Sequence, residues 1–294
     1  MSAQFYTGPF TYTGNKRRLM PQLAPHLPEA TTYIDLFAGS GTVGLNAPAQ
    51  HVHFNDTNAD NIELLKYLAH TPAQDVERAT DNLIAHYNLP QAKAELMTPA
   101  GQHAYNRLRD DYNNAPTVEK YYALILHCFN NQARKNAKGK FNQTGGHRGF
   151  HTQARQKLYE YHARAQQISA TFSIGDFRTV NTGTHPDTVV YADPPYLGTD
   201  TPYQLRSAWT GTDERDLYEY LDDVHQRGQR FIVSNVFAMK GTENTILKTW
   251  AQKYNVHHLA MTYATANHGY KHRNDKVDEV AITNFDNDPA LTLF

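Results

Sequence analysis

The chain has 294 residues, which is enough for one large domain or two smaller ones. Its 28 Lys and Arg residues nearly balance 29 Asp and Glu residues, so the net charge of −1 gives no sign of a nucleic-acid partner. A single cysteine excludes an intramolecular disulfide and a cysteine-based zinc cluster, and the sixteen histidines are scattered, so we expect no bound metal. The chain shows neither a signal peptide nor a run of about 18 apolar residues, and we expect a soluble cytoplasmic protein.

The near-neutral total hides an uneven distribution of charge. Residues 120–159, the basic block, hold eight Lys and Arg residues and no Asp or Glu. The block therefore carries +8, and the other 20 basic and 29 acidic residues carry −9. A molecule polarised in this way is typical of proteins that bind a polyanion. The basic residues of the block are Lys120, Arg134, Lys135, Lys138, Lys140, Arg148, Arg155 and Lys157.

Short runs rich in β-branched and aromatic residues predict six strands, at 32–36, 51–54, 171–174, 188–192, 230–234 and 279–283. Most of these runs are almost continuously apolar, as expected for strands that helices cover on both faces. Segments with apolar residues at helical spacing, such as 61–69 and 213–227, lie between them. This alternation predicts a layered α/β sheet.

The alternation stops between residues 72 and 168. The sequence there shows helix-like segments and a glycine-containing loop at 136–149, but no good strand. This region also contains the whole basic block. We therefore expect a domain formed by residues 1–71 and 169–294, interrupted by an inserted, mainly helical subdomain formed by residues 72–168.

A glycine-rich loop follows the first predicted strand. It reads Gly39-Ser-Gly41-Thr-Val-Gly44, and an acidic residue, Asp56, follows the next strand. Glycines let the backbone approach a ligand, a helix N-terminus offers free N–H groups, and the acid suits ribose hydroxyls, so the loop predicts an adenosine-containing cofactor. NAD and S-adenosylmethionine both fit, and a tight turn without a ligand is the alternative. Phe37 ahead of the first glycine, together with the lack of a hydride-transfer constellation, favours S-adenosylmethionine.

A second motif, Asp193-Pro194-Pro195-Tyr196, follows the apolar strand at 188–192. Two prolines remove two N–H donors, so the turn offers only acceptors, the Asp193 carboxylate and the Pro194 carbonyl, beside an aromatic ring. These acceptors suit an exocyclic amine on a planar base, with Tyr196 stacked on that base. The amine then attacks an activated methyl group without a general base, because the cofactor supplies the electrophile. A simple strand-ending turn is the alternative, which the glycine loop upstream disfavours.

Together the motifs resemble the Dam-like DNA adenine-N6 methyltransferases, the D12 class with α-type motif order. The resemblance covers most of the chain in collinear order. Its most specific match lies in the basic block, where Asn130-x3-Arg134-x-Asn136-x2-Gly139-x-Phe141-Asn142 resembles the family's signature near the DNA. The other matching segments are 12–16, 35–41, 55–58, 175–177, 193–196, 233–235 and 276–280.

The resemblance implies a Rossmann-like S-adenosylmethionine-dependent methyltransferase sheet of seven strands, with a late antiparallel hairpin and an inserted DNA-recognition subdomain. It places the segment 12–16 beside the methionine end of the cofactor, Asp56 on the ribose and the segment 175–177 beside the adenine. The implied cofactor-binding residues are Tyr12, Lys16, Asp35, Phe37, Gly39, Gly41, Asp56, Asp176 and Phe177. The implied catalytic residues are Asp193, Pro194, Pro195 and Tyr196, and the implied DNA-binding residues are Arg134, Asn136, Lys138, Lys140, Asn142 and Arg148.

The expected reaction is transfer of a methyl group from S-adenosylmethionine to the N6 amine of adenine in double-stranded DNA. An amine inside a duplex is out of reach, so the base must flip out of the helix. The implied partner is double-stranded DNA with a specific adenine site, with a cognate restriction endonuclease as a further partner, and we expect a monomer. The alternatives are a cytosine-N4 or RNA amine methyltransferase, a DNA-binding relative without activity, and an NAD oxidoreductase.

Three segments depart from the family pattern. The glycine loop opens with Asp35-Leu36 in place of the commoner Glu-Pro, residues 143–146 replace the family's V-P-Y/F-G, and residues 197–210 have no counterpart. The segments 143–146 and 197–210 lie where DNA contacts are expected. These two departures therefore leave the DNA sequence that is recognised undetermined, but they do not affect the expected reaction. A second basic cluster, at 268–273 with Lys276, either contacts the DNA backbone or forms an exposed loop.

Overall fold

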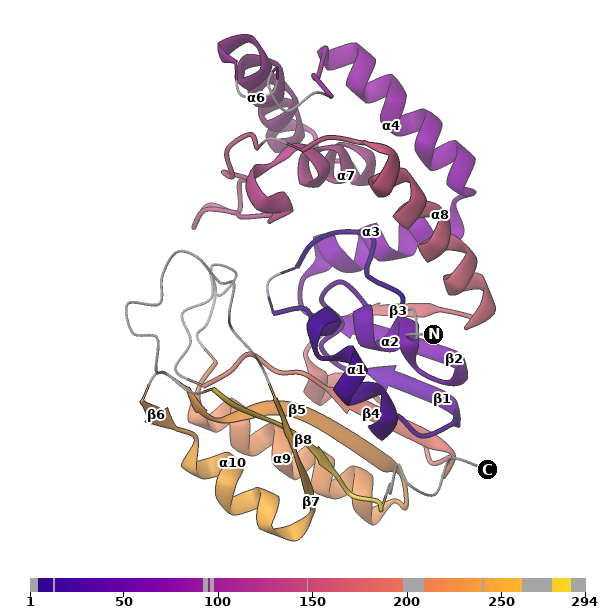
Figure 1. Cartoon of the computed structure of the whole chain (residues 1–294), viewed down its shortest axis with the longest axis vertical. Coiled ribbons are helices and arrows are strands. Elements are labelled where there is room, and N and C mark those ends of the chain that lie inside the picture. Colours follow the sequence, from indigo (N-terminus) through magenta and orange to yellow (C-terminus); the bar gives the residue numbers. More distant parts are fainter. Residues whose placement is uncertain are drawn as a thin grey trace.

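The computed structural model describes residues 5–12, 14–91, 95, 98–146, 148–197, 209–239, 241–260 and 277–286. Its centre is an eight-stranded sheet of the order β3-β2-β1-β4-β5-β8-β7, with the short β6 paired to β5 (Figure 1). The strands are β1 (Ala30–Asp35), β2 (Ala49–Asp56), β3 (Thr171–Ile174), β4 (Thr188–Ala192), β5 (Arg230–Met239), β6 (Thr242–Glu243), β7 (Asn255–Leu259) and β8 (Asp278–Thr283).

The sheet is parallel from β3 to β5, whereas β8 runs antiparallel to both β5 and β7. All six predicted strands are present, and β3 and β4 have the predicted bounds. The late antiparallel hairpin that the resemblance implied is present as β7 and β8. The sequence pattern missed β7, because it is an edge strand with two histidines, and it missed β6, which has only two residues. The predicted α/β sheet is confirmed.

Helices surround the sheet and fill the inserted region (Figure 1). The α-helices are α1 (Met20–Leu23), α2 (Thr42–Asn46), α3 (Ala59–His70), α4 (Ala73–Tyr87), α6 (Pro99–Asn114), α7 (Val118–His127), α8 (Thr152–Gln167), α9 (Gly211–Gln226) and α10 (Thr245–Trp250). The 3₁₀ helices are η1 (Lys16–Arg18), η2 (Ala24–His26), η3 (Phe129–Asn131), η4 (Phe177–Thr179) and η5 (Ala251–Lys253).

The two helices predicted at 61–69 and 213–227 are present as α3 and α9. Both begin two residues earlier than the apolar pattern indicates, at Ala59 and Gly211. The reason is capping: the side chains of Asn58 and Thr210 accept hydrogen bonds from backbone N–H groups of the first turn. The hydrophobic pattern alone does not contain this information.

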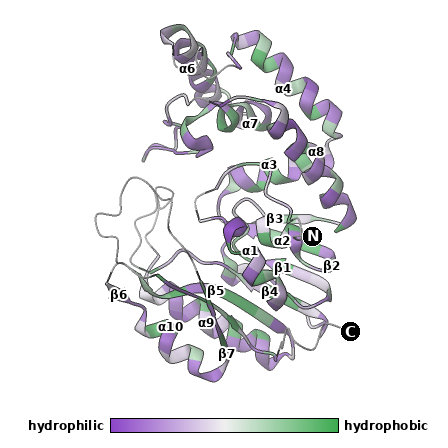
Figure 2. Cartoon of the chain, viewed as in Figure 1, coloured by the Kyte–Doolittle hydropathy of each residue, from purple (hydrophilic) through white to green (hydrophobic). Residues whose placement is uncertain are grey.

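Alternate residues of the strands pack against different helices, so both faces of the sheet are covered. Tyr33 and Tyr191 belong to one buried cluster, together with side chains of α1, α2 and α3. Ile34 and Val190 belong to a second cluster, together with side chains of α9 and α10. Figure 2 shows the hydrophobic character of β5 in the sheet and the mixed residues along the helices. The result is a three-layer α/β/α domain.

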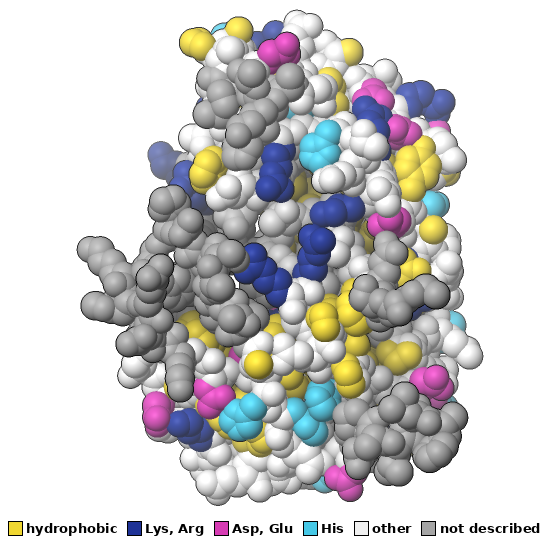
Figure 3. All heavy atoms as spheres, viewed as in Figure 1, with side chains coloured by type: hydrophobic (Ala, Val, Ile, Leu, Met, Phe, Trp, Pro, Cys, Tyr) yellow, Lys and Arg dark blue, Asp and Glu magenta, His cyan; other side chains and the backbone are white. Residues whose placement is uncertain are grey.

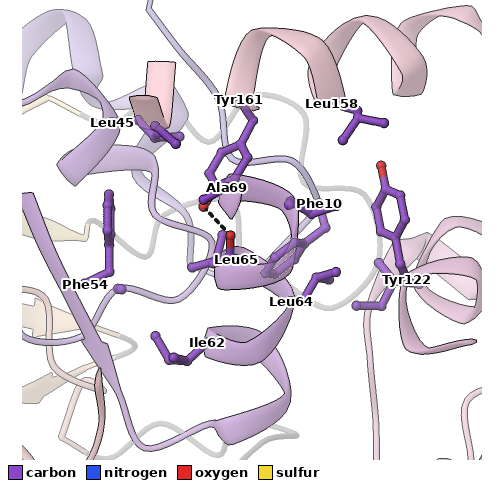
Figure 4. Close-up of a cluster of buried hydrophobic side chains, with 14 of the residues drawn as sticks. Phe10, Leu45, Phe54, Ile62, Leu64, Leu65, Ala69, Tyr122, Leu158 and Tyr161 are labelled. Atoms are coloured by element: carbon purple, nitrogen blue, oxygen red, sulfur yellow. Dashed lines mark hydrogen bonds between the residues drawn. The ribbon is translucent and has the colours of Figure 1, made fainter. Parts of the chain in front are cut away.

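Residues 72–168 form α4, α6, α7 and α8 and, in the part that the structure describes, no strand beyond two isolated β-bridges. Helix α3 lies between this region and the sheet, with Leu45 and Phe54 on one side and Tyr122 and Leu158 on the other (Figure 4). The Tyr161 hydroxyl of α8 donates a 2.9 Å hydrogen bond to the Leu65 carbonyl of α3 (Figure 4). One continuous hydrophobic core therefore joins the insert to the sheet, and the domain bounds at 72 and 168 stay a prediction.

Cys128 lies buried at the end of α7, as expected for a structural thiol. Its Sγ donates to the Ile125 carbonyl at 3.4 Å, and burial raises the pKa of the thiol to about 12, so the reactive thiolate is disfavoured. Among the helices that the structure describes, none is long and apolar enough to cross a bilayer.

Candidate active site

Three carboxylates gather at the edge formed by the carboxyl ends of the parallel strands. Asp35 ends β1, Asp56 ends β2 and Asp193 follows β4. Each lies two residues beyond a buried aromatic residue of the face that packs on α3, so strand alternation turns all three toward the same face. Asp35 and Asp56 are buried, whereas the Asp193 side chain keeps 18% of its exposure. Ligands of open α/β sheets bind at this edge, and Asp193 is the most exposed of the three carboxylates.

A lysine from the N-terminal segment holds the second motif. Lys16 Nζ, at the start of η1, lies 2.6 Å from Asp193 Oδ1 and donates a 2.8 Å hydrogen bond to the Tyr196 hydroxyl. That hydroxyl donates a 2.9 Å hydrogen bond to Glu279 Oε1, and Lys16 Nζ lies 3.8 Å from the same oxygen. The sequence assigned Lys16 to the cofactor and gave Glu279 no function. The structure brings both to the second motif.

Neighbouring charges at this motif favour the protonated form of Lys16 and limit the rise in the pKa of Asp193. Burial raises the pKa of Asp193 to about 6, and the Lys16 ammonium limits that rise. Burial disfavours the ammonium of Lys16, but the neighbouring Asp193, Tyr191 and Glu279 outweigh burial and raise the pKa of Lys16. At neutral pH the motif therefore presents a carboxylate acceptor next to a fixed ammonium.

The glycine loop is shaped by close contacts that exclude side chains. Gly39 has a φ of +52°, and a Cβ atom there would lie 2.8 Å from the Tyr12 ring. A Cβ atom at Gly44 would lie 2.3 Å from the Phe54 ring, so this glycine lets α2 pack closely on β2. The structure thus places Tyr12 directly against the loop, while Gly41, with a φ of +76°, caps α2.

Asp35 has one carboxylate oxygen without a partner among the described residues. Its Oδ2 accepts a 3.3 Å hydrogen bond from the Gly44 N–H, whereas Oδ1 is buried and accepts none. Burial and the charge of Asp193 raise the pKa of Asp35 to about 8. A buried polar oxygen of this kind calls for a donor or a cation, which a ligand at this edge can supply.

Asp56 ties the second strand to the glycine loop. Its Oδ2 accepts a 2.8 Å hydrogen bond from the Gly39 N–H, and its Oδ1 accepts one from the N–H two residues later. The neighbouring Asn55 side chain donates to the carbonyls of Leu36 and Gly175 at 3.1 and 3.0 Å. These bonds join the ends of β1, β2 and β3, so the segment 175–177 lies beside the glycine loop.

Three aromatic rings form an apolar wall next to this loop. The Phe37 ring lies 5.5 Å from the Phe177 ring and 5.7 Å from the Trp209 ring, and the last two lie 5.9 Å apart. The sequence selected the two phenylalanines but missed Trp209, which lies in a segment without a family counterpart. Asp176 pairs with Arg178 at 3.0 Å and caps η4, so its carboxylate is committed to the protein in this structure.

The family signature in the basic block forms a short hairpin at residues 134–142. The Asn136 side-chain oxygen accepts hydrogen bonds from the N–H groups two and four residues later, at 3.0 and 3.1 Å. Gly139 sits in this turn with a φ of +73°, a conformation that costs glycine little. The predicted base-reading residue Asn136 therefore holds the turn with its side-chain oxygen.

The hairpin is anchored to the insert by an aromatic side chain. Phe141 is buried, and its ring lies 6.0 Å from Tyr112 and 6.2 Å from Tyr121. Across the hairpin, Arg134 Nε donates a 3.0 Å hydrogen bond to the Asn142 side chain. The signature residues thus fix the shape and the position of a loop on which Lys138 and Lys140 are exposed.

Six of the eight cations of the basic block fall into two groups. Lys120, Lys135 and Arg155 bind carbonyl or carboxylate groups of neighbouring helices, so part of the +8 charge is neutralised inside the protein. The Lys135 ammonium pairs with Asp60 of α3. The second group, which is exposed, consists of Lys138, Lys140 and Arg148.

The exposed cations continue toward the N-terminal segment. The charges of Arg17 and Arg148 lie close enough to Lys157 of α8 to lower its pKa, together with burial, which is the larger cause. Arg17 directly follows Lys16, so this cationic surface reaches the side of the second motif. Figure 3 shows Lys and Arg side chains gathered along the middle of one face, between the helical insert and the sheet.

Some predicted features cannot be placed. The second basic cluster at 268–273 and Lys276 lies outside the described residues, as do residues 198–208. Within the described ranges, no group of three or more His, Cys, Asp or Glu residues is arranged to hold a metal ion. The two site residues that the sequence missed, Trp209 and Glu279, each had a recognisable feature: an aromatic residue before a helix cap and an acid in an apolar strand.

Comparison with known proteins agrees with this geometry. The family model for the D12 class N6 adenine-specific DNA methyltransferases matches residues 12–265. The type II methyltransferase M.FokI of Planomicrobium okeanokoites is 29% identical over 291 residues, which are 96% of this chain but 43% of the relative. The modification methylase LlaI of Lactococcus lactis subsp. lactis is 30% identical over 254 residues, 84% of this chain and 39% of the relative. The DNA adenine methylase of Escherichia coli K12 is 25% identical over 280 residues, 92% of both chains.

The chain therefore spans less than half of the first two relatives and nearly all of the third. The family match covers the glycine loop, the hairpin signature and the second motif in one collinear stretch. This chain belongs to the D12 class of N6 adenine-specific DNA methyltransferases.

Proposed function

We propose that this chain transfers a methyl group from S-adenosylmethionine to the N6 amine of adenine in double-stranded DNA, after flipping the base out of the helix. The observation that carries the proposal is the contact of Lys16 with both Asp193 and Tyr196 at the carboxyl end of β4. This contact fixes a carboxylate acceptor and an aromatic ring beside the glycine loop. Membership of the D12 class supports the same reaction.

The residues around the glycine loop fit S-adenosylmethionine. The partnerless Asp35 Oδ1 suits a cationic group of this ligand, and the aromatic wall of Phe37, Phe177 and Trp209 suits its adenine ring. Asp56, at the end of β2, suits the ribose hydroxyls. When bound, S-adenosylmethionine supplies a methyl group on a sulfonium, which an amine attacks without first losing a proton.

The chain's own residues then act by positioning. The Asp193 carboxylate accepts a hydrogen bond from the target amine, the Pro194 carbonyl accepts the second, and the two acceptors orient the nitrogen for attack. Lys16 keeps Asp193 ionised and in place, since it lies 2.6 Å from it. Tyr196 stacks on one face of the flipped base.

Double-stranded DNA fits the cationic surface. Flipping a base costs a few kcal/mol, and contacts to the phosphates must offset this cost. The exposed Lys138, Lys140 and Arg148 lie on and beside the anchored hairpin and supply such contacts. Arg17, next to Lys16, carries the same surface to the second motif.

The names of the relatives suggest a biological setting. The relatives from Planomicrobium okeanokoites and Lactococcus lactis are called type II methyltransferase and modification methylase. We extend the proposal accordingly to a cognate restriction endonuclease as partner, to the DNA of a bacterial or phage-infected cytoplasm as the place of action, and to a monomer as the working form.

The test is product identification. The protein is incubated with tritiated S-adenosylmethionine and several unmethylated DNAs, which are then hydrolysed to nucleosides; we expect N6-methyladenine. Label in N4-methylcytosine or in an RNA control would replace the proposal by its alternatives. Cofactor binding in a thermal-shift assay without transfer to any DNA would indicate a non-catalytic relative.

The Asp193→Ala variant tests the assignment of the second motif. It should lose methyl transfer, because the amine acceptor is removed, and keep the thermal shift with S-adenosylmethionine, because Asp193 lies at the second motif rather than on the glycine loop. The matched control is Asp223→Ala on α9, whose side chain is 66% exposed and which should methylate like the wild type. Equal activity of Asp193→Ala and the wild type would overturn the assignment.

A further inference from the structure

Glu279 is a buried carboxylate in β8, the strand between β5 and the edge strand β7. It lies in β8, where it pairs with Val236 of β5 and with Leu259 of β7, and only 3% of its surface is exposed. By strand alternation its side chain shares a face with Ala281, which belongs to the buried cluster on the α3 side. A buried charge costs free energy that an apolar residue would avoid, so its presence here calls for an explanation.

The contacts of this carboxylate lead to the second motif. Glu279 Oε1 accepts a 2.9 Å hydrogen bond from the Tyr196 hydroxyl, and Lys16 Nζ lies 3.8 Å away. Lys16 also donates to the same hydroxyl at 2.8 Å. The hydroxyl is therefore held from two sides, by a donor from η1 and by an acceptor from β8.

Two-sided anchoring matters for a ring that stacks. A tyrosine ring turns about two side-chain bonds, and stacking on a planar base requires one orientation of the ring plane. Holding the hydroxyl fixes this orientation before the base arrives, so less conformational entropy is lost when it binds. Phenylalanine at this position would keep the ring and lose the anchor.

We propose that Glu279 is a positioning residue, which sets the orientation of the Tyr196 ring through its hydroxyl for stacking on the flipped base. The proposal rests on the proposed function for the identity of the base, but the anchoring itself is a property of the free protein. Glu279 touches neither the base nor the cofactor in this account; it acts through Tyr196.

A competing explanation is that Glu279 acts only as a second counter-ion of Lys16. The two explanations differ in how substitutions combine. If Glu279 acts through the hydroxyl, removing the hydroxyl and removing the carboxylate disturb the same contact, so their effects do not add. If it acts through the charge on Lys16, the effects add.

The experiment is a double-mutant cycle of Glu279→Leu and Tyr196→Phe, read as the single-turnover rate of methylation. The probes are tritiated S-adenosylmethionine and genomic DNA from a host without adenine methylation. Glu279→Leu should slow methylation about tenfold, the size of one hydrogen bond to a charged group, and Tyr196→Phe by at least as much. The double variant should be no slower than Tyr196→Phe alone, because that variant already removes both contacts of the hydroxyl. Glu279→Gln keeps a carbonyl acceptor for the hydroxyl and should recover most of the rate. Asp278→Asn, the preceding residue in β8, is the control and should match the wild type.

A second readout does not depend on methylation. In protein labelled with 3-fluorotyrosine, the ¹⁹F resonance of Tyr196 is assigned by its loss in Tyr196→Phe. We expect this resonance to shift and broaden in Glu279→Leu and to stay close to its wild-type position in Glu279→Gln and Asp278→Asn. An unchanged resonance in Glu279→Leu, or rate effects that add, would overturn the proposal. If the wild type transfers no methyl group, the proposed function fails, and the resonance alone decides whether Glu279 holds the ring.

Discussion

The ammonium of Lys16 lies 2.6 Å from the carboxylate of Asp193, although 177 residues separate them in the chain. The N-terminal segment thus lies against the end of β4, where the Lys16 ammonium contacts the Asp193 carboxylate. The side chains are 5% and 18% exposed, so water screens their attraction only partly. Lys16 therefore both holds the Asp193 carboxylate in place and lowers its pKa.

The first prediction removes this cation. Lys16→Met should lower the rate of methyl transfer by about 100-fold, since a preorganised charge next to the reacting group is lost. The affinity for S-adenosylmethionine should change far less, because Lys16 contacts the second motif rather than the glycine loop. Transfer rates and isothermal titration calorimetry separate the two effects.

Arg18→Met provides the control for this variant, because Arg18 is an exposed cation of the same short helix. It should leave the transfer rate near that of the wild type. Breaking a buried ion pair costs about 3–5 kcal/mol of stability, so both variants are assayed well below their unfolding temperatures. A Lys16→Met variant that loses cofactor affinity and transfer in equal measure would return Lys16 to the cofactor site.

The second prediction concerns pH. In the proposed reaction the ionised Asp193 carboxylate is the acceptor for the amine, and burial raises the pKa of Asp193 to about 6. As the pH falls through about 6 the carboxylate becomes protonated, so the single-turnover rate should fall on the acid side and level off above pH 7. Because Lys16 lowers the pKa of Asp193, Lys16→Met should move the acid limb to higher pH. A wild-type profile that stays flat down to pH 5 would contradict this assignment.

The third prediction concerns Asp35. Its pKa is raised to about 8 by burial and by Asp193, so the side chain is mostly protonated at pH 7 in the free protein. A cationic ligand beside the partnerless Oδ1 favours the carboxylate and lowers this pKa, so binding at pH 7 should release a proton. Above about pH 9 the carboxylate is already ionised and the release should vanish.

Titration calorimetry in phosphate and in Tris measures this release, because the two buffers take up protons with different enthalpies. Asp35→Asn should bind S-adenosylmethionine more weakly and release no proton, whereas Asp223→Asn on the surface of α9 should behave like the wild type. Binding enthalpies that are equal in both buffers at pH 7 would show that Asp35 does not meet the positive charge of the ligand.

The alternation of residues in the strands contains information about where the acidic side chains of the site lie. Tyr33, Phe54 and Tyr191 are the apolar residues that set the buried face, and the acids follow two residues after each of them. Alternation in a strand places the three carboxylates on one face and at one edge, so the sequence contained this arrangement although we did not predict it. The glycine loop and the motif at 193–196 were predictable for the same reason, since each depends on residues that are neighbours in sequence.

The parts that the sequence missed depend on contacts between distant segments. Glu279 reaches Tyr196 across 83 residues, and Lys16 reaches both from the other end of the chain. The acid in an apolar strand marks Glu279 as unusual, but no periodicity in the sequence tells which distant residue it contacts. The same holds for Lys135. The sequence does not show that Lys135 forms an ion pair with Asp60, whereas the lysines next to it in the hairpin are exposed.

The last prediction compares the exposed lysines of the hairpin with the ion-paired Lys135. Lys138 and Lys140 are exposed and flank the turn, so the double variant Lys138→Gln, Lys140→Gln should weaken DNA binding through lost phosphate contacts. Each lost contact lowers the dependence of log K on log salt by about 0.9, so the slope should decrease by about 1.8. Fluorescence anisotropy with a labelled duplex at several salt concentrations measures this slope.

Lys135→Gln is the matched control, because it removes one lysine charge from the same hairpin. Its ammonium pairs with Asp60, and both side chains are about 30% exposed, so the loss should cost at most about 1 kcal/mol of stability. The slope of log K against log salt should stay at the wild-type value, since no phosphate contact is lost. Equal slopes for the double variant and the wild type would place the DNA elsewhere on the cationic surface. A decrease of about 0.9 in the slope for Lys135→Gln would show that DNA displaces Asp60 from its lysine.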